Sequence, residues 1–278
     1  MNIELRLIAA DGRDAVPLLL HRPANGAAKC PLMVCVHGYT RQPLDHLQAF
    51  APAANAAGFA LLLPLFRDSG PHRTYQQLVH PRRGTRSDLA LLEAIDGIAK
   101  DHGLDATRVH LFGYSGGAQF VHRLALLHPQ RVASLGIGAA GWYTWPDTVQ
   151  AWPQGLADAP GTEGCAPDMP AFLRLPIALW VGERDDGPDA HLREDPELNS
   201  VQGTNRLERA RRWAAAIREQ AAQRDIEACV SLEVLPRAGH DFLACHRKAG
   251  LAERAMAHAV RAMGRGSPVS GLAALPLC

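Results

Sequence analysis

Short apolar runs alternate along the chain with longer segments in which apolar residues recur every three or four positions. The runs at Leu32–Gly38, Phe59–Leu65 and Ile177–Gly182 are almost continuously apolar, as is typical of strands buried on both faces. Thr85–Lys100 shows the other pattern, which predicts an amphipathic helix. This alternation predicts a mostly parallel sheet with helices on both faces.

The chain opens differently, with two apolar runs on either side of a turn. Ile3–Ala9 and Ala15–Pro23 flank the pair Asp11-Gly12, which predicts a hairpin. Further strands are expected at Val109–Phe112, Val132–Gly141 and Val230–Pro236, and further helices at Leu47–Ala57, Gly117–Leu127, Asn205–Gln223 and Ala252–Met263.

The alternation lapses after Gly141, where Trp, Pro, Gly and Asp become frequent. We interpret the segment 142–174 as a lid-like insertion in a single domain that spans residues 1–278. Aromatic residues in this segment either line an apolar substrate pocket or anchor the insertion to the body, and both interpretations stay open. The residues concerned are Trp142, Tyr143 and Trp145.

Composition narrows the class of protein. Hydrophobic residues make up 47% of the chain and charged residues 21%, which indicates a globular protein with a sizeable core. The 29 basic and 28 acidic side chains leave a net charge of +1, so neither a nucleic-acid partner nor an acidic membrane is expected. The N-terminus does not resemble a signal peptide, and the apolar runs are too short to span a bilayer, so we expect a cytoplasmic location.

The six cysteines stand apart in the sequence, and none belongs to a CxxC pair. The motifs of zinc ribbons and thioredoxins are therefore missing. We expect neither a metal nor another cofactor.

The stretch RVHLFGYSGGAQF carries the strongest chemical signal. Gly113, Ser115 and Gly117 form a G-x-S-x-G pattern between a predicted strand and a predicted helix. This arrangement is typical of a nucleophile elbow, in which small residues let strand and helix pass closely and expose the serine hydroxyl. Ser115 is therefore the candidate nucleophile.

A serine hydroxyl needs a base, and the base needs an orienting acid. His240 follows the last predicted strand, within AGHDF, and is the candidate base. Asp185 follows the strand Ile177–Gly182 and is the favoured acid, with Asp186 as the alternative. The chain order Ser, Asp, His is the one expected for the α/β-hydrolase arrangement.

The developing oxyanion needs fixed hydrogen-bond donors. The His37-Gly38 pair ends a predicted strand and turns the chain, so that the backbone N–H of Tyr39 is expected to face the site. The N–H of Gly116, next to the nucleophile, is the second candidate donor.

The motifs HGYT, RVHLFGYSGGAQF, VGERDD and AGHDF together resemble the α/β-hydrolase superfamily, in order and spacing, over essentially the whole chain. The phrase LDATRVHLFGYSGG resembles the polyhydroxybutyrate-depolymerase and feruloyl-esterase branch. The resemblance implies an α/β-hydrolase fold with an eight-stranded sheet and a serine esterase activity. It also implies Ser115, Asp185 and His240 as the triad, and Tyr39 and Gly116 as the oxyanion hole.

The expected activity is hydrolysis of a small-molecule carboxylic ester through an acyl-enzyme intermediate. The same residues also suit an amide, thioester or lactone hydrolase or an acyltransferase, and a non-catalytic receptor on the same scaffold is a further alternative. Tyr114 and Gln119 flank the elbow and either contact the substrate or pack beneath it. Arg206 and Arg209 are expected to pair with the acidic segment REDPE at 193–197.

Overall fold

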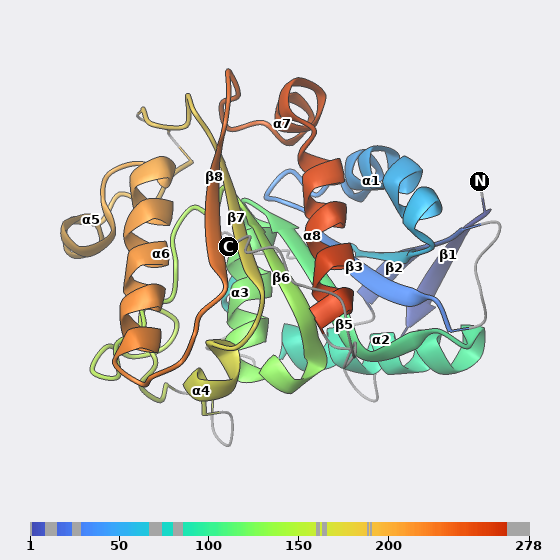
Figure 1. The fold of residues 1–278 in the computed structure, drawn as a ribbon, viewed down its shortest axis with the longest axis horizontal. Coiled ribbons are helices and arrows are strands. Elements are labelled where there is room, and N and C mark those ends of the chain that lie inside the picture. Colours follow the sequence, from blue (N-terminus) through green and yellow to red (C-terminus); the bar gives the residue numbers. More distant parts are fainter. Residues whose placement is uncertain are drawn as a thin grey trace, which may run out of the picture.

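The computed structural model describes residues 2–8, 16–23, 29–66, 74–79, 86–159, 162, 166–187, 189 and 191–265. Within these residues the chain forms an eight-stranded sheet flanked by helices (Figure 1). The strands are β1 (Asn2–Ile8), β2 (Val16–Arg22), β3 (Pro31–Val36), β4 (Ala60–Pro64), β5 (Asp105–Tyr114), β6 (Val132–Gly138), β7 (Ile177–Gly182) and β8 (Val230–Leu235). The α-helices are α1 (Pro43–Ala57), α2 (Ser87–His102), α3 (Gly116–Leu127), α4 (Met169–Phe172), α5 (Pro196–Gln202), α6 (Arg206–Ala222), α7 (Phe242–Ala249) and α8 (Leu251–Arg265), with short 3₁₀ turns η1 (Thr74–Gln77) and η2 (Pro129–Arg131).

The strands follow the order β1-β2-β4-β3-β5-β6-β7-β8 across the sheet. β1 pairs with β2, and β2 with β4, in antiparallel fashion, whereas every later pair is parallel. The mostly parallel sheet expected from the sequence is therefore confirmed. Because the strands from β3 to β8 run in one direction, the loops that follow them meet at one edge of the sheet.

Helices cover both faces of the sheet. The larger apolar core lies on one face and includes residues of α2, α3 and α6, while the smaller core on the other face includes residues of α1, α7 and α8. Figure 1 shows this layering, with α8 in front of the sheet and α3 behind it. The prediction of helices on both faces is confirmed.

The alternation of side chains along β3 explains why two cores form. Leu32, Val34 and Val36 belong to the larger core, and Met33 and Cys35 belong to the smaller one. Successive side chains of a strand point to opposite faces, so a strand buried on both faces must be apolar at every position. The continuous apolar run in the sequence is the direct result.

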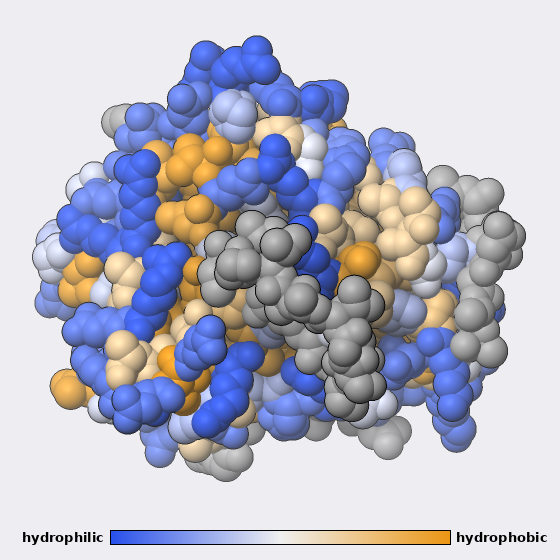
Figure 2. All heavy atoms as spheres, in the orientation of Figure 1, coloured by the Kyte–Doolittle hydropathy of each residue, from blue (hydrophilic) through white to orange (hydrophobic). Residues whose placement is uncertain are grey.

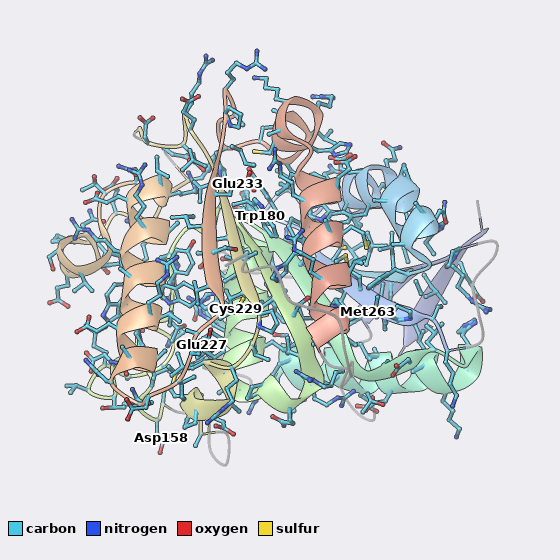
Figure 3. All side chains as sticks on the ribbon, viewed as in Figure 1. Asp158, Trp180, Glu227, Cys229, Glu233 and Met263 are labelled. Carbon is cyan, nitrogen blue, oxygen red and sulfur yellow. The ribbon has the colours of Figure 1, made fainter. Side chains whose placement is uncertain are left out.

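The edge strand β8 is less buried than the central strands. Trp180 of β7 lies beside Glu233 of β8, and its indole N–H donates to the Glu233 carboxylate at 3.1 Å (Figure 3). Val230, Leu232 and Val234 of β8 are only partly buried. Apolar atoms gather in the region of this strand on the face shown in Figure 2. Strand β8 therefore mixes polar and apolar positions, as suits a half-covered edge.

The segment 142–174 packs on the body of the molecule. Tyr143 stacks on Trp213 of α6 with ring centres 4.8 Å apart, and the Trp213 indole donates to the Thr144 carbonyl at 3.0 Å. Trp152 and Phe172 belong to the same core as α3 and α6. The segment has no separate core among the described residues.

The short helices α5 and α7 are among those that were not predicted from the sequence, as is the four-residue α4. Helices α5 and α7 have seven and eight residues, which is too short for apolar periodicity to emerge. Capping residues mark the start of both α5 and α7, because Asp195 accepts from the Leu198 N–H at 3.2 Å and Asp241 accepts from the Ala244 N–H at 2.6 Å.

The two strands of the predicted hairpin form as expected, while the turn at Asp11-Gly12 lies outside the described residues. None of the described helices combines the length and the apolar composition needed to cross a bilayer.

Candidate active site

Ser115 occupies a sharp turn between β5 and α3. Its backbone has φ 53° and ψ −112°, in the region of positive φ that non-glycine residues rarely adopt. Its N–H donates to the Gly138 carbonyl at 2.7 Å, which ties the turn to the neighbouring strand β6. The turn places the serine at the carboxyl edge of the sheet, as the elbow pattern predicted.

The glycines around Ser115 are needed for close approach of strand and helix. A Cβ on Gly113 would lie 2.2 Å from the Gly117 carbonyl oxygen, and a Cβ on Gly117 would lie 2.1 Å from the carbonyl oxygen of Val36. Both clashes are with backbone atoms, which cannot move aside without disturbing the sheet. Only glycine fits at these two positions.

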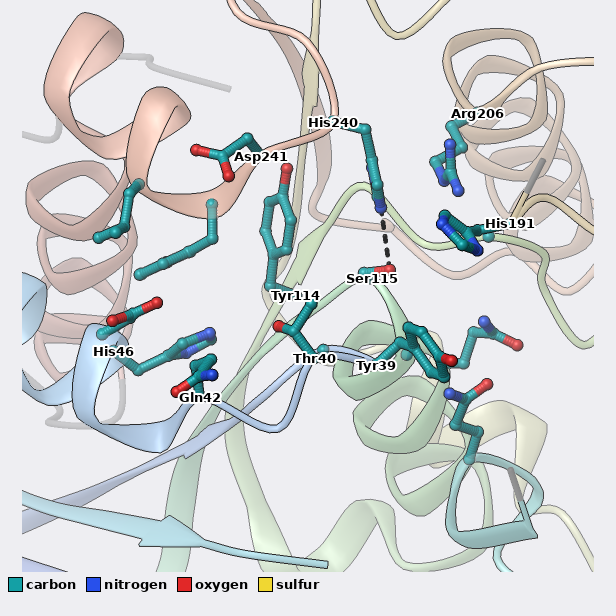
Figure 4. Close-up of a pocket in the computed structure, with 18 residues that line it drawn as sticks. Tyr39, Thr40, Gln42, His46, Tyr114, Ser115, His191, Arg206, His240 and Asp241 are labelled. Atoms are coloured by element: carbon teal, nitrogen blue, oxygen red, sulfur yellow. Dashed lines mark hydrogen bonds between the residues drawn. The ribbon is translucent and has the colours of Figure 1, made fainter. Parts of the chain in front are cut away.

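Three side chains from three different loops form a hydrogen-bonded series. Ser115 Oγ lies 3.0 Å from His240 Nε2 (Figure 4), and His240 Nδ1 lies 2.9 Å from Asp185 Oδ2. Because a carboxylate only accepts, Nδ1 carries the proton of the neutral imidazole and Nε2 is free to accept from the serine hydroxyl. This arrangement can remove the proton of the hydroxyl as its oxygen attacks an electrophile.

Of the two acids considered from the sequence, the structure brings Asp185 to His240. Asp185 is only 5% exposed, whereas the adjacent Asp186 is exposed to solvent. The second oxygen of Asp185 accepts from the Arg206 guanidinium at 3.1 Å, and the same guanidinium nitrogen also donates to Asp189 at 2.5 Å. The expectation that Arg206 pairs with segment 193–197 is therefore wrong, because Arg206 is buried and faces the loop after β7.

Burial and hydrogen bonding have opposite effects on the pKa of Asp189. Burial favours the protonated form, but the His191 N–H and the Arg206 guanidinium both stabilise the carboxylate. The net effect lowers the pKa of Asp189 below its ordinary value, so that this carboxylate is an ionised partner for Arg206.

The loop after β3 lies against the nucleophile. A Cβ on Gly38 would lie 3.3 Å from the Cβ of Ser115, so residues 38 and 115 are close neighbours. Tyr39 and Gly116 both line the pocket at Ser115. The two residues proposed from the sequence as backbone donors are thus brought together beside the serine.

His37 holds this loop through both ring nitrogens. Its Nε2 accepts from the Phe66 N–H at 3.1 Å, so Nδ1 carries the proton and donates to the Gly38 carbonyl at 2.8 Å. Burial lowers the pKa of His37 to about 4, which keeps the ring neutral at physiological pH. The Tyr75 hydroxyl adds a bond to the His37 carbonyl at 3.3 Å.

The pocket at Ser115 encloses about 240 Å³. This volume is at the small end for ligand sites, which favours small substrate groups. In Figure 4, His46 and Asp241 lie on one side of the Ser115–His240 pair, and His191 and Arg206 lie on the other. The lining also includes three glutamines, of which Gln76 and Gln119 are buried and Gln42 is exposed.

The aromatic residues proposed as substrate contacts divide into two groups. Tyr114 lines the pocket and stacks on His240, with ring centres 5.5 Å apart. Trp142, Tyr143 and Trp145 are absent from the lining among the described residues. The ring of Trp142 instead lies 4.0 Å from the Arg123 guanidinium, a packing contact that favours the anchoring interpretation.

Sequence reasoning missed several pocket residues. Gln76, His191 and Arg206 line the pocket although none stands in a recognisable motif. Gln119 was noted only for its position after the elbow. Closeness in sequence to a motif was therefore the only feature that could have identified a pocket residue. Gln76 and Arg206 lie far from every motif in the sequence.

The chain matches no protein-family model and no curated protein. Its structure is similar to a poly(aspartic acid) hydrolase from Sphingomonas sp. KT-1, with TM-score 0.76, 24% identity and coverage of 88% of this chain and 96% of that one. It is also similar to the poly(3-hydroxybutyrate) depolymerase LpqC from Bordetella parapertussis, with TM-score 0.75, 25% identity and coverage of 90% and 88%. An S-formylglutathione hydrolase from Agrobacterium tumefaciens matches with TM-score 0.59, 15% identity and coverage of 93% and 94%. The resemblance predicted from the motifs is confirmed, and the chain has the fold of the α/β-hydrolase superfamily.

Proposed function

We propose that this chain is a serine hydrolase that cleaves a small carboxylic ester through an acyl-enzyme intermediate. The observation that carries the proposal is the hydrogen bond between Ser115 Oγ and His240 Nε2 at 3.0 Å. Asp185 holds the opposite ring nitrogen in the tautomer that this step needs. The similarity to a solved depolymerase and a solved hydrolase supports the same reaction class.

In the first half of the reaction, Ser115 Oγ attacks the ester carbonyl carbon while its proton passes to His240 Nε2. The Asp185 carboxylate stabilises the imidazolium that forms. The backbone N–H groups of Tyr39 and Gly116 donate to the oxyanion. Collapse of the tetrahedral intermediate breaks the bond to the alcohol, which leaves with the proton from His240.

In the second half, a water molecule attacks the acyl-enzyme. His240 takes a proton from the water, and a second tetrahedral intermediate forms at the same carbonyl carbon. Its collapse breaks the bond to Ser115 Oγ, which recovers its proton from His240. The carboxylic acid is released, and no cofactor takes part in any step.

We assign the insertion at 142–174 a supporting role in this scheme rather than a role as a moving lid. Its Trp152 indole donates to the Gln77 carbonyl at 2.9 Å, next to the pocket residue Gln76. The buried aromatic residues of the insertion thus hold one pocket wall in place.

The test is hydrolysis of p-nitrophenyl butyrate by the wild type, Ser115→Ala and the control Ser200→Ala. Ser200 is exposed on α5, away from the pocket lining. Ser115→Ala should lower kcat/KM by about 10³-fold or more, and Ser200→Ala should leave it unchanged. Equal activity in Ser115→Ala would contradict the proposal. Failure of a fluorophosphonate to label Ser115 would favour a non-catalytic receptor.

Amide hydrolysis is the second candidate, because one similar structure is named as a hydrolase of poly(aspartic acid), an amide-linked polymer. The same three residues can serve either bond type. Rates of hydrolysis of p-nitrophenyl butyrate and of the matched amide p-nitrobutyranilide distinguish ester hydrolysis from amide hydrolysis. Turnover of the ester with none of the anilide would support an esterase.

A further inference from the structure

We propose that Gln76 and Gln119 form a subsite that binds an uncharged amide group in the acyl part of the substrate. The inference rests on the proposed hydrolase function and names the class of acyl group that the site accepts. It follows from the burial of the two side chains, their lack of hydrogen bonds and the space that surrounds them.

Both glutamines are buried polar groups without partners in the described part of the chain. Gln76 is 5% exposed and Gln119 is 6% exposed, and both line the pocket at Ser115. The Gln119 side-chain oxygen has no hydrogen bond, and the Gln76 amide has none to any described residue. Buried polar groups are normally hydrogen-bonded, so the unpaired Gln119 oxygen, in the same pocket lining as the Gln76 amide, points to a bound molecule beside the nucleophile.

Each of these amides lies against a glycine. A Cβ on Gly116 would lie 2.3 Å from the Gln76 amide nitrogen, and a Cβ on Gly141 would lie 3.1 Å from the amide nitrogen of Gln119. Gly116 adjoins Ser115 and carries one of the proposed oxyanion donors. The Gln76 amide is therefore close to where the acyl carbonyl would sit.

The backbone that carries Gln76 is fixed. Its carbonyl accepts from the buried Arg123 guanidinium at 2.5 Å, and the next carbonyl, that of Gln77, accepts from Trp152 at 2.9 Å. Gln119 lies in the first turn of α3, and its N–H donates to the Ser115 carbonyl at 3.2 Å. The backbone that carries both glutamines is thus held in place before any substrate binds, which favours selective binding.

The Arg206 side chain adds a donor to the same pocket. It is 2% exposed, lines the pocket, and its Nε has no hydrogen bond to any described residue. Its positive charge is already matched by Asp185 and Asp189. A neutral acceptor such as a carbonyl oxygen therefore suits this donor better than a second carboxylate does.

An amide group in the substrate complements the Gln76, Gln119 and Arg206 side chains, because it supplies both an N–H donor and a carbonyl acceptor. The N–H can donate to a glutamine carbonyl oxygen, and the carbonyl can accept from a glutamine NH₂ or from Arg206. An alkyl chain of the same shape would displace water from these groups and leave them unpaired. Sites of this kind discriminate strongly against the substrate that lacks the polar group.

The test uses two methyl esters of nearly identical shape, methyl N-acetylglycinate and methyl 4-methylpentanoate. Acid release is followed by titration at constant pH, and each kcat/KM is divided by the rate constant of alkaline hydrolysis of that ester. Wild type should then favour the amide ester by about 10-fold or more. A normalised ratio near one would overturn the inference.

Gln76→Leu and Gln119→Leu should each reduce this normalised ratio by about 10-fold, mainly through loss of activity on the amide ester. Gln48→Leu is the matched control, because Gln48 is an exposed glutamine on α1 and is not among the residues that line the pocket. It should leave the ratio unchanged. Equal loss on both esters in the Gln76 and Gln119 variants would contradict the subsite.

Ser115→Ala separates this inference from the proposed function. If neither ester is turned over in a Ser115-dependent way, the hydrolase proposal fails and the subsite fails with it. If both esters are turned over through Ser115 without the expected ratio, the subsite alone is wrong.

Discussion

Arg206 and His240 hold opposite oxygens of the Asp185 carboxylate. The guanidinium donates to Oδ1 at 3.1 Å, while the imidazole lies 2.9 Å from Oδ2. Asp185 therefore accepts from one guanidinium and one imidazole ring. The orientation of His240 depends on a carboxylate that Arg206 helps to fix, which makes Arg206 a positioning residue for the proposed reaction.

Replacing Arg206 should destabilise the fold. Arg206→Gln leaves the buried Asp185 without its cation, and breaking a buried pair in this way costs about 3 kcal/mol. Arg212→Gln on the same helix is the control, because Arg212 forms an exposed pair with Glu208 that contributes less than about 1 kcal/mol. Urea unfolding of both variants measures the difference. Similar losses would contradict a special role for the buried pair.

The two neighbouring aspartates should respond differently to the same change. Asp185→Asn removes the acceptor that selects the His240 tautomer, so kcat for p-nitrophenyl butyrate should fall by about 10³- to 10⁴-fold. Asp186→Asn should leave kcat within about two-fold, because Asp186 is exposed. Thermal unfolding would verify that both variants are folded in the assay. Comparable activities would remove Asp185 from the mechanism.

Two glycine substitutions should have opposite effects on stability. Gly117→Ala places a Cβ 2.1 Å from the Val36 carbonyl oxygen and should lower the free energy of unfolding by at least about 2 kcal/mol. Gly97 lies within α2 with nothing within 4 Å of its would-be Cβ. Gly97→Ala should raise stability by up to about 1 kcal/mol, since alanine favours the helix. Denaturant midpoints for the two variants check both signs.

Stability should fall as the solution is acidified below about pH 6.5. Burial lowers the pKa of His46 to about 3 and that of His110 to about 4, whereas both take their ordinary value of 6.5 in the unfolded chain. The unfolded state therefore binds more protons in this range, and stability rises with pH until it levels off above the unfolded value. Unfolding free energies measured between about pH 7 and pH 5 test the sign.

The variant His46→Phe tests how much His46 contributes to this pH dependence of stability. It keeps an aromatic ring in place of the imidazole that stacks on Phe242 at 3.9 Å. The slope of unfolding free energy against pH should then decrease by up to about 1.4 kcal/mol per pH unit. An unchanged slope would mean that His46 takes up no proton on unfolding.

Much of the architecture was predictable because its signals lie between neighbours in the chain. The continuous apolar run at Leu32–Gly38 predicted a strand buried on both faces, and the structure places β3 there. The elbow was equally local, since the glycines around Ser115 are required within one strand–turn–helix unit. The short helices α5 and α7 escaped prediction because seven or eight residues carry too little periodicity.

The sequence by itself determined the order of the strands and the long helices, the strained serine turn and the choice of His240 among 13 histidines. The tertiary structure decided which groups surround these residues. Gln76 reaches Gly116 only because η1 packs beside α3, and Arg206 reaches Asp185 only because α6 begins beside the loop after β7. Periodicity and turn geometry act between near neighbours, whereas pocket walls depend on contacts between distant segments, which no local pattern records.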